Sequence, residues 1–230
     1  MVMAMAENEL RVVIPTLNEC LTISPLLHKI NYVCDALQIP REILVVDDGT
    51  DRTAEIAATH AHTLVLHFDT RLALGEILRI GLCSPTGAEW TLVMDAGGSH
   101  EASVIRGLWS RRNTADVVIA SRFYYNTSHW GLRSLVSRIA TALYRQHLPI
   151  WITDVTTSFR LYRTKPMLRA LMGVKGEGFD FHPDLLVQMY RQGCTICEVP
   201  APYILTNSTF RPSMLIQGLK TWARLFQSRS

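Results

Sequence analysis

The sequence predicts an α/β protein whose central sheet is mostly parallel and covered by helices on both faces. Two observations support this fold class. Short, almost entirely apolar segments alternate with amphipathic segments of helical period as far as residue 123, and strands that are buried on both faces of a parallel sheet have this composition. Polar residues also follow the apolar segments, and the carboxyl ends of parallel strands line the ligand crevice of such a sheet.

The expected elements follow from the periodicity of apolar residues. The segment 21–37 carries apolar residues at helical spacing and predicts a helix. Further helices are expected at 53–61, 74–83, about 104–109 and 131–147, and between residues 163 and 176. Strands are expected at 10–16, 42–49, 62–68, 90–96 and 115–123, with a late strand within 195–205.

Size, charge and cysteine content limit the function classes. The 230 residues fit one large domain, for which we expect bounds of 1–212, followed by an amphipathic helix at 213–230. A net charge of +3 is too small to indicate nucleic acid binding, although it suits an anionic substrate. No apolar stretch approaches the roughly 20 residues of a membrane span, and no signal peptide is expected. Five cysteines favour a reducing, cytoplasmic location, with Cys194 and Cys197 as structural thiols.

Asp47, Asp48 and Gly49 end the second expected strand. This arrangement places a carboxylate in the crevice, where Asp47 can accept hydrogen bonds from the ribose or base of a nucleotide. A structural alternative has equal weight, in which Thr50 or Asp51 caps the following helix. Both hold if Asp47 faces the crevice while Thr50 or Asp51 forms the cap.

Seven segments, taken together, carry a much more specific signal. They read VVIPTLNE, EILVVDDGTDRTAEIA, RLALGEILRIGL, LVMDAGGSH, ADVVIASRF, DVTTSFRLYR and GFDFHPDLL with EVPAPY. In order and spacing they resemble family 2 glycosyltransferases, most closely the dolichyl-phosphate mannosyltransferase group, from about Leu10 to Tyr203. The resemblance implies the GT-A fold and transfer of a sugar from a nucleotide-sugar donor to a polyprenyl phosphate.

The resemblance also implies roles for individual residues. Donor-binding residues would be Pro15, Leu17, Glu19, Val45, Asp47, Gly75, Asp95 and Ala96. Catalytic residues would be Asp95, Arg122 and Arg133. Residues at the acceptor phosphate would be Arg122, Arg133, Ser137 and Arg211. Judged by its helix alone, Arg133 is an exposed surface arginine, and the resemblance reverses that interpretation. Leu17 stands where the family often has an aromatic residue, so weaker stacking on the base is expected.

The chain departs from the family where a metal ion is bound. The family sequence is Asp-Ala-Asp, whereas this chain has Asp95, Ala96 and Gly97. The second acid helps to hold Mg²⁺ or Mn²⁺, which prefer oxygen ligands, and glycine offers no side-chain ligand. We therefore expect Asp95 to be a weak metal ligand, and we expect Gly97→Asp to strengthen metal binding.

The C-terminal region departs as well. The family has an arginine and a lysine in a segment that closes over the diphosphate, and Thr206 and Met214 stand near those positions here. Arg211 is a replacement for one of these charges, and with Arg122 and Arg133 it is a candidate for neutralising phosphate without a full metal site.

The C-terminal helix has two interpretations of equal weight. It is basic and carries Leu215, Leu219, Trp222 and Phe226 at helical spacing, which suits a membrane interface. The same pattern suits a helix that packs on the domain. The first interpretation implies peripheral association with the cytoplasmic membrane face or with a membrane-protein partner.

Three functions remain open from the sequence. The leading one is a glycosyltransferase that uses a nucleotide sugar and a polyprenyl phosphate in an inverting displacement. The second is a metal-independent transferase with an unusual donor or a small soluble acceptor. The third is a family member that binds nucleotide without catalysis.

Overall fold

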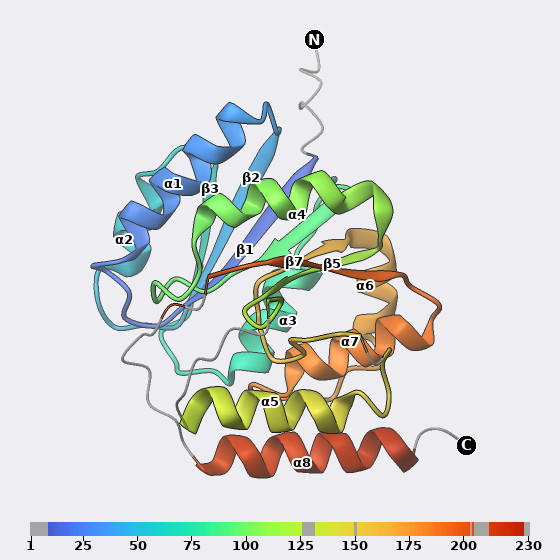
Figure 1. Cartoon of the computed structure of the whole chain (residues 1–230). Coiled ribbons are helices and arrows are strands. Elements are labelled where there is room, and N and C mark those ends of the chain that lie inside the picture. Colours follow the sequence, from blue (N-terminus) through green and yellow to red (C-terminus); the bar gives the residue numbers. More distant parts are fainter. Residues whose placement is uncertain (1–8, 126–131, 150, 203, 205–211, 228–230) are drawn as a thin grey trace.

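The computed structural model describes residues 9–125, 132–149, 151–202, 204 and 212–227. These residues form a seven-stranded sheet of order β3-β2-β1-β4-β6-β5-β7, with helices on both faces (Figure 1). The expected α/β class with a mostly parallel sheet is confirmed.

Six of the described strands run in one direction, and β6 alone runs against its neighbours. The strands are β1 Leu10–Thr16, β2 Arg41–Asp47, β3 Thr63–His67, β4 Trp90–Val93, β5 Val117–Ser121, β6 Arg160–Arg163 and β7 Ile196–Pro200. Six lie where strands were expected, and β6 was missed. Its four residues are Leu161 and Tyr162 between two arginines, and this segment is too short and too polar to predict a buried strand.

The helices form two layers of different thickness. On one face lie α1 Ile23–Ala36, α2 Thr53–Ala58 and α4 Ile105–Arg111, with 3₁₀ turns at Ala102–Val104 and Arg112–Thr114. On the other face lie α3 Leu74–Cys83, α6 Thr164–Leu171 and α7 Phe181–Arg191. Beyond them lie α5 Leu132–Tyr144 and α8 Pro212–Gln227, side by side (Figure 1).

Alternation along the strands divides the core between the two faces. In β1, Val12 and Ile14 pack towards α1, whereas Val13 packs towards α3, because successive side chains of a strand point to opposite sides. Helix α3 lies close to the sheet. A Cβ atom at Gly81 would stand 2.6 Å from Val13 Cγ1, so only glycine allows this approach.

One face of α8 packs on the domain. Leu225 is fully buried, the Thr221 hydroxyl donates to Asp180 at 2.7 Å, and the Trp222 indole donates to the carbonyl oxygen of Leu143 at 3.1 Å. The opposite face remains exposed at Ile216 and Leu219. Packing on the domain is therefore confirmed, while the role of the outer face and the division after residue 212 stay predictions. Among the described residues, no helix is long and apolar enough to cross a membrane.

Candidate functional site

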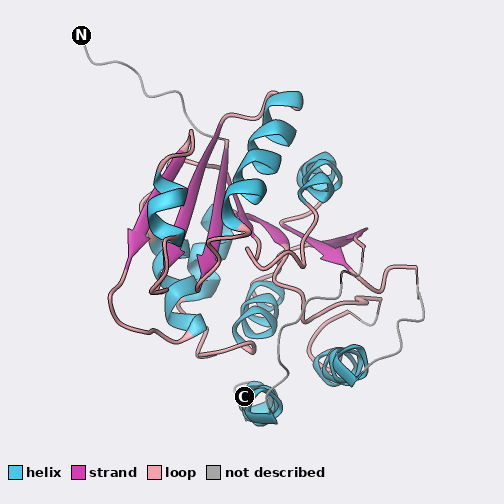
Figure 2. Ribbon diagram, turned by 90° about the vertical axis from the view of Figure 1, so that its left-hand side faces the viewer, coloured by secondary structure: helices cyan, strands magenta, loops and turns pink. Residues whose placement is uncertain are grey.

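The carboxyl ends of the parallel strands gather most of the predicted site residues at one edge of the sheet. Thr16 ends β1, Asp47 ends β2, Asp95 follows β4 and Arg122 follows β5. In Figure 2 the arrowheads of the parallel strands on the left lie towards the same, lower edge. This edge is where open parallel sheets bind ligands.

Asp47 lies beneath this edge and not in the open crevice. Its carboxylate is fully buried, accepts the Thr16 hydroxyl at 2.7 Å, and lies 2.8 Å from His67 Nδ1. The expectation that Asp47 faces the crevice is therefore wrong, because both oxygens join the ends of β1, β2 and β3. Its predicted contact with a nucleotide stays a prediction.

Asp48 is also buried and holds the chain after β3. Its carboxylate accepts Arg71 Nη1 at 2.6 Å and the amide of Leu72 at 2.8 Å. The Arg71 side chain is 60% exposed, so it presents a cation at the strand edge. The sequence analysis did not identify Arg71, because its partner Asp48 lies 23 positions away and no local sequence pattern indicates the pair.

Two loops at the edge are tied together. Asn18 has a positive φ of 57° and accepts the Thr50 amide at 2.8 Å. The amide of Glu19 donates to the Thr53 hydroxyl at 2.8 Å. Asp51 accepts the amide of Thr53, the first residue of α2, at 2.9 Å. Asp51 thus holds the first amide of the helix, although the N-cap residue is Arg52, whose side chain forms no cap bond. Side chains therefore fix the loop that carries Glu19.

Asp95 stands in a closed turn. His100 Nδ1 accepts the Asp95 amide at 2.9 Å, and His100 Nε2 lies 3.8 Å from Asp95 Oδ2. The His100 ring stacks on Phe159 with a centroid distance of 4.8 Å. The Asp95 side chain is 45% exposed, so its carboxylate is available to a ligand. His100 positions the turn.

The space beside Gly97 contains another carboxylate. A Cβ atom built at Gly97 would stand 3.1 Å from Glu19 Oε1 and 3.9 Å from Glu19 Cδ. The described residues contain no group of three or more metal-binding side chains arranged to hold an ion. A cation at this position would therefore have few protein ligands, Asp95 among them, and would need donor phosphates and water, a combination that Mg²⁺ accepts.

The Arg122 guanidinium is paired with the buried carboxylate of Asp154. Its Nε and Nη2 donate to the two oxygens of Asp154 at 2.7 and 2.9 Å, and Nη2 also donates to Thr156 Oγ1 at 2.7 Å. Burial by itself would raise the pKa of Asp154, but the charge and hydrogen bonds of Arg122 outweigh burial and lower it. The bidentate pair fixes the arginine beside the end of β5, and sequence reasoning missed Asp154 within DVTTSFR.

A second cation lies near Arg122. The Arg138 guanidinium stands 4.6 Å from the centroid of the Phe123 ring, and that of Arg122 stands 5.4 Å from it. Helix α5 carries Arg138 and the half-buried Ser137. The side chain of Arg133, also on α5, lies outside the described residues. Two guanidinium groups therefore lie at the end of β5, and that of Arg122 is paired with the buried Asp154.

A neutral histidine lies under the edge. Burial lowers the pKa of His182 to about 3, and the charge of Arg160 adds to this effect against the opposing charge of Asp95. Arg160 is itself fully buried and donates to the carbonyl oxygens of His182, at 2.8 Å, and Val155. His182 thus contributes no charge to the site near neutral pH.

Several other predicted donor residues are placed differently from the expectation. Val45 is fully buried in the core next to α1, and Ala96 is buried as well. Gly75 is covered by the 176–177 loop, where a Cβ atom would stand 2.7 Å from the carbonyl oxygen of Gly176. The donor contacts of these three residues stay predictions. Pro15 is half-buried and Leu17 is exposed at the edge.

The predictions for the segment before α8 cannot be placed. Thr206 and Arg211 lie outside the described residues, and so does the side chain of Met214. Cys194 and Cys197 are free thiols whose pKa values burial raises.

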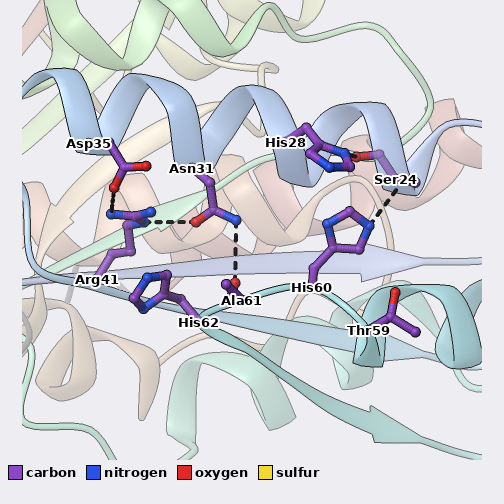
Figure 3. Close-up of a pocket in the computed structure, with 9 residues that line it drawn as sticks. All are labelled: Ser24, His28, Asn31, Asp35, Arg41, Thr59, His60, Ala61 and His62. Atoms are coloured by element: carbon purple, nitrogen blue, oxygen red, sulfur yellow. Dashed lines mark hydrogen bonds and ion pairs between the residues drawn. The ribbon is translucent and has the colours of Figure 1, made fainter.

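An open hollow of about 470 Å³ lies away from the predicted residues, between α1 and the chain at 59–62 (Figure 3). His28 and His60 meet edge to face there, with ring centroids 4.6 Å apart. Arg41 in the same hollow is paired with Asp35 at 2.7 Å. None of the predicted donor or acceptor residues lines it, so the hollow is separate from the strand edge.

The fold and its edge define a class of protein first. The chain has the GT-A fold of glycosyltransferases. It superimposes on a glucosyl-3-phosphoglycerate synthase from Mycobacterium tuberculosis, solved with Mn²⁺, UDP and glucosyl-3-phosphoglycerate, with a TM-score of 0.72 and 18% identity. The match covers 96% of this chain and 79% of that one. The same enzyme solved with Mn²⁺, UDP-glucose and phosphoglyceric acid gives a TM-score of 0.74 at 17% identity, with the same coverage.

The sequence identifies the family within that fold. The pattern described as Glycosyl transferase family 2 matches residues 11–169, and the chain belongs to this family. An undecaprenyl-phosphate mannosyltransferase from Micrococcus luteus is 32% identical over an alignment of 206 positions, and the match covers 84% of this chain and 82% of the relative. A polyprenol monophosphomannose synthase from Mycolicibacterium smegmatis is 29% identical over 205 residues, 84% of this chain and 76% of the relative.

Proposed function

We propose that this glycosyltransferase moves a hexosyl group, with mannosyl as the first candidate, from a nucleotide diphosphate sugar to a polyprenyl phosphate. One observation carries the proposal. Two curated relatives whose names state this type of reaction each match 84% of the chain.

The two sides of the edge suit the two substrates. The acidic side, after β1 and β4, carries Glu19 and the exposed Asp95, and Arg71 stands beside it. We assign the donor to this side. The cationic side, after β5, carries Arg122 and Arg138 around Phe123, and we assign the acceptor phosphate to it.

The transfer requires that the two substrates are held in line and that their negative charges are compensated. It needs no strong base. A phosphate monoester has a second pKa near 6, so the acceptor is already a nucleophilic anion at neutral pH. Its oxygen attacks the anomeric carbon while the bond from that carbon to the nucleoside diphosphate breaks, and the bonding electrons leave with the diphosphate. Arg122, fixed by Asp154, holds the acceptor phosphate in line, and Arg138 reduces the repulsion between the two anions. Arg133, Ser137 and Arg211 stay predicted contacts of the acceptor phosphate.

A divalent cation is compatible with the acidic side. Asp95 would hold it together with donor phosphates, and the bound ion would stabilise negative charge on the leaving diphosphate. Mg²⁺ and Mn²⁺ both fit oxygen ligands of this type.

The outer helical layer suits a lipid-soluble acceptor. Leu135 and Ile139, one turn apart on α5, are 55% and 51% exposed, and Ile216 and Leu219 on α8 are 57% and 49% exposed. We infer that α5 and α8 rest on an anionic lipid surface, which brings the acceptor phosphate to the end of β5. This arrangement makes the enzyme peripheral to the membrane.

Labelled sugar transfer tests the proposal. The purified protein is incubated with labelled GDP-mannose, UDP-glucose or UDP-N-acetylglucosamine, together with undecaprenyl phosphate in detergent. We expect label in the organic phase from one donor. Undecaprenol, which lacks the phosphate, is the matched control and should accept none. Transfer only to a soluble acceptor such as 3-phosphoglycerate would support the alternative with a small acceptor. Nucleotide binding without any transfer would support the non-catalytic alternative.

A further inference from the structure

We propose that Glu19 supplies the carboxylate that Gly97 lacks, so that Asp95 and Glu19 together bind a divalent cation at the donor diphosphate. The inference rests on the proposed function, because it assumes a donor with a diphosphate at this edge. It assigns a metal-binding role to a residue that the sequence placed only against the nucleotide.

The geometry places the Glu19 carboxylate next to the position where the family has its second acid. Glu19 Oε1 lies 3.1 Å from the position of a Cβ atom at residue 97. The carboxylate oxygens of an aspartate at 97 would lie two bonds from that Cβ atom. Glu19 Oε1 therefore lies beside the space into which an aspartate at 97 would extend, although it comes from the loop after β1 and not from the turn after β4.

The Glu19 carboxylate is oriented by its own loop. Its Oε2 accepts the Thr22 hydroxyl at 2.7 Å, which leaves Oε1 directed at Gly97. Its main chain is fixed by the bond from its amide to Thr53 and by bonds from Thr22 and Ile23 to its carbonyl oxygen. A ligand held in this way needs little ordering when a cation binds.

The electrostatics also favour a cation. Within the described part of the chain, no lysine or arginine nitrogen lies within 4.0 Å of the carboxylate of Glu19 or Asp95, and His100 Nε2 lies 3.8 Å from Asp95 Oδ2. Two carboxylates at one edge repel each other unless a positive charge stands between them. Hard divalent cations take carboxylate oxygens together with phosphate and water.

The same geometry changes the expectation for Gly97. An aspartate there would place a second carboxylate against Glu19, with a Cβ contact of 3.1 Å to Oε1 of a carboxylate whose other oxygen, Oε2, accepts the Thr22 hydroxyl. Gly97→Asp alone should therefore weaken metal binding or leave it unchanged, contrary to the expectation from sequence. When Glu19 is also replaced by Gln, the aspartate at 97 should be able to bind the cation.

An exchange of the two positions tests the inference. Mn²⁺ is titrated into the protein with saturating GDP, and separately with UDP, while electron paramagnetic resonance measures the free ion. The variants are Glu19→Gln, Glu19→Asp, Gly97→Asp and the double variant Glu19→Gln with Gly97→Asp. Asp69→Asn is the matched control, because it removes one fully exposed carboxylate from the loop after β3.

The expected order of affinities is specific. Glu19→Gln should weaken Mn²⁺ binding at least about tenfold, as loss of metal-site interactions commonly does, and the shorter Glu19→Asp should weaken it as well. The double variant should bind Mn²⁺ more tightly than Glu19→Gln, and Asp69→Asn should match the wild type. Wild-type affinity in Glu19→Gln, or tighter binding in Gly97→Asp alone, would overturn the inference. So would a wild-type protein that binds no Mn²⁺.

A second measurement separates this inference from the proposed function. Affinity for GDP and UDP in chelator, and labelled transfer to undecaprenyl phosphate, are measured for the same proteins. If the wild type transfers sugar but Glu19→Gln leaves Mn²⁺ binding intact, only the role of Glu19 fails. If the wild type binds Mn²⁺ through Glu19 but binds no nucleotide and transfers no sugar, the proposed function fails instead.

Discussion

The two halves of the sheet edge differ in charge and in how they are built. After β1, β2 and β4, the edge carries the carboxylates of Glu19, Asp47, Asp48 and Asp95, each supplied by a strand that leads into the next helix of the chain. After β5, the edge carries Arg122, which follows the strand directly, and Arg138 from the helix α5, and both guanidinium groups lie over the Phe123 ring. In the proposed function the acidic half handles the donor and the cationic half handles the acceptor phosphate.

The comparison shows that buried carboxylates have different structural roles in the two halves. In the acidic half, Asp47 and Asp48 are buried and join neighbouring strands, while Asp95 stays exposed for a ligand. In the cationic half, the buried acid Asp154 fixes Arg122, the arginine that we propose contacts the acceptor phosphate. Variants of the buried groups should therefore cost stability, and variants of the exposed groups should cost binding.

The largest effect is expected in the cationic half. Asp154→Asn removes the buried carboxylate that accepts two hydrogen bonds from the Arg122 guanidinium, and breaking such a buried pair should cost about 3–5 kcal/mol in unfolding by urea. Sugar transfer should fall as well, because Arg122 is no longer held. Glu89→Gln is the matched control, since it removes an exposed partner of Arg163 and should cost less than about 1 kcal/mol. Equal stabilities of the two variants would contradict the buried role of Asp154.

A smaller effect is expected for the buried acid of the other half. Asp47→Ala leaves Thr16 and His67 without their partner and should cost about 1–3 kcal/mol of unfolding free energy. Affinity for GDP or UDP in calorimetry should fall in parallel, because the ends of three strands lose their link. Thr16→Val removes one of the two bonds and should cost less than Asp47→Ala. An Asp47→Ala protein of wild-type stability would show that these bonds do not hold the edge together.

The pH dependence of stability should reveal the neutral His182. Its pKa is about 3 in the folded protein and about 6.5 when unfolded, so between these values the unfolded state binds more protons. Titration of His182 therefore does not change the unfolding free energy above about pH 6.5. Below that pH, protonation of His182 in the unfolded state lowers the unfolding free energy by about 1.4 kcal/mol per pH unit. His182→Gln, compared with the wild type in urea at pH 7, 6 and 5, should lose less stability on acidification. The charges that face His182 are Arg160, Asp95 and His100, and parallel pH profiles would contradict this assignment.

The smallest effect on stability, with a clear effect on binding, is expected for the outer face of α8. Ile216→Ser combined with Leu219→Ser should change the unfolding free energy by no more than about 0.5 kcal/mol, because both side chains are exposed. Co-sedimentation with anionic vesicles should nevertheless decrease. Tyr32→Ser, an equally simple loss of an exposed apolar group on α1, is the control and should bind vesicles as the wild type does. If the double variant sediments with vesicles as the wild type does, the proposal that α8 faces the lipid is contradicted.

The sequence predicted the first half of the fold better than the second for a physical reason. Each strand and helix from β1 to β5 has an apolar pattern of its own, so local periodicity was enough to place them. The strand β6 takes its stability from neighbours on both sides, β4 and β5, and its buried Arg160 hides the pattern. The same limit applies to α8, where periodicity gave an apolar stripe but could not say which face meets α5 and α7.

By itself, the sequence determined the fold class, the family resemblance, and the clustering of polar groups at the carboxyl ends of strands. These depend on local composition and chain order, which are visible residue by residue. The tertiary structure alone decided which of those groups are buried partners and which face a ligand. Asp47 and Val45 were expected in the crevice and are buried, and the Glu19 carboxylate reaches the gap at Gly97 from 78 positions away in the chain. Pairings over such distances depend on how separate loops pack, because hydrogen bonds and charge compensation are satisfied in space and not along the sequence.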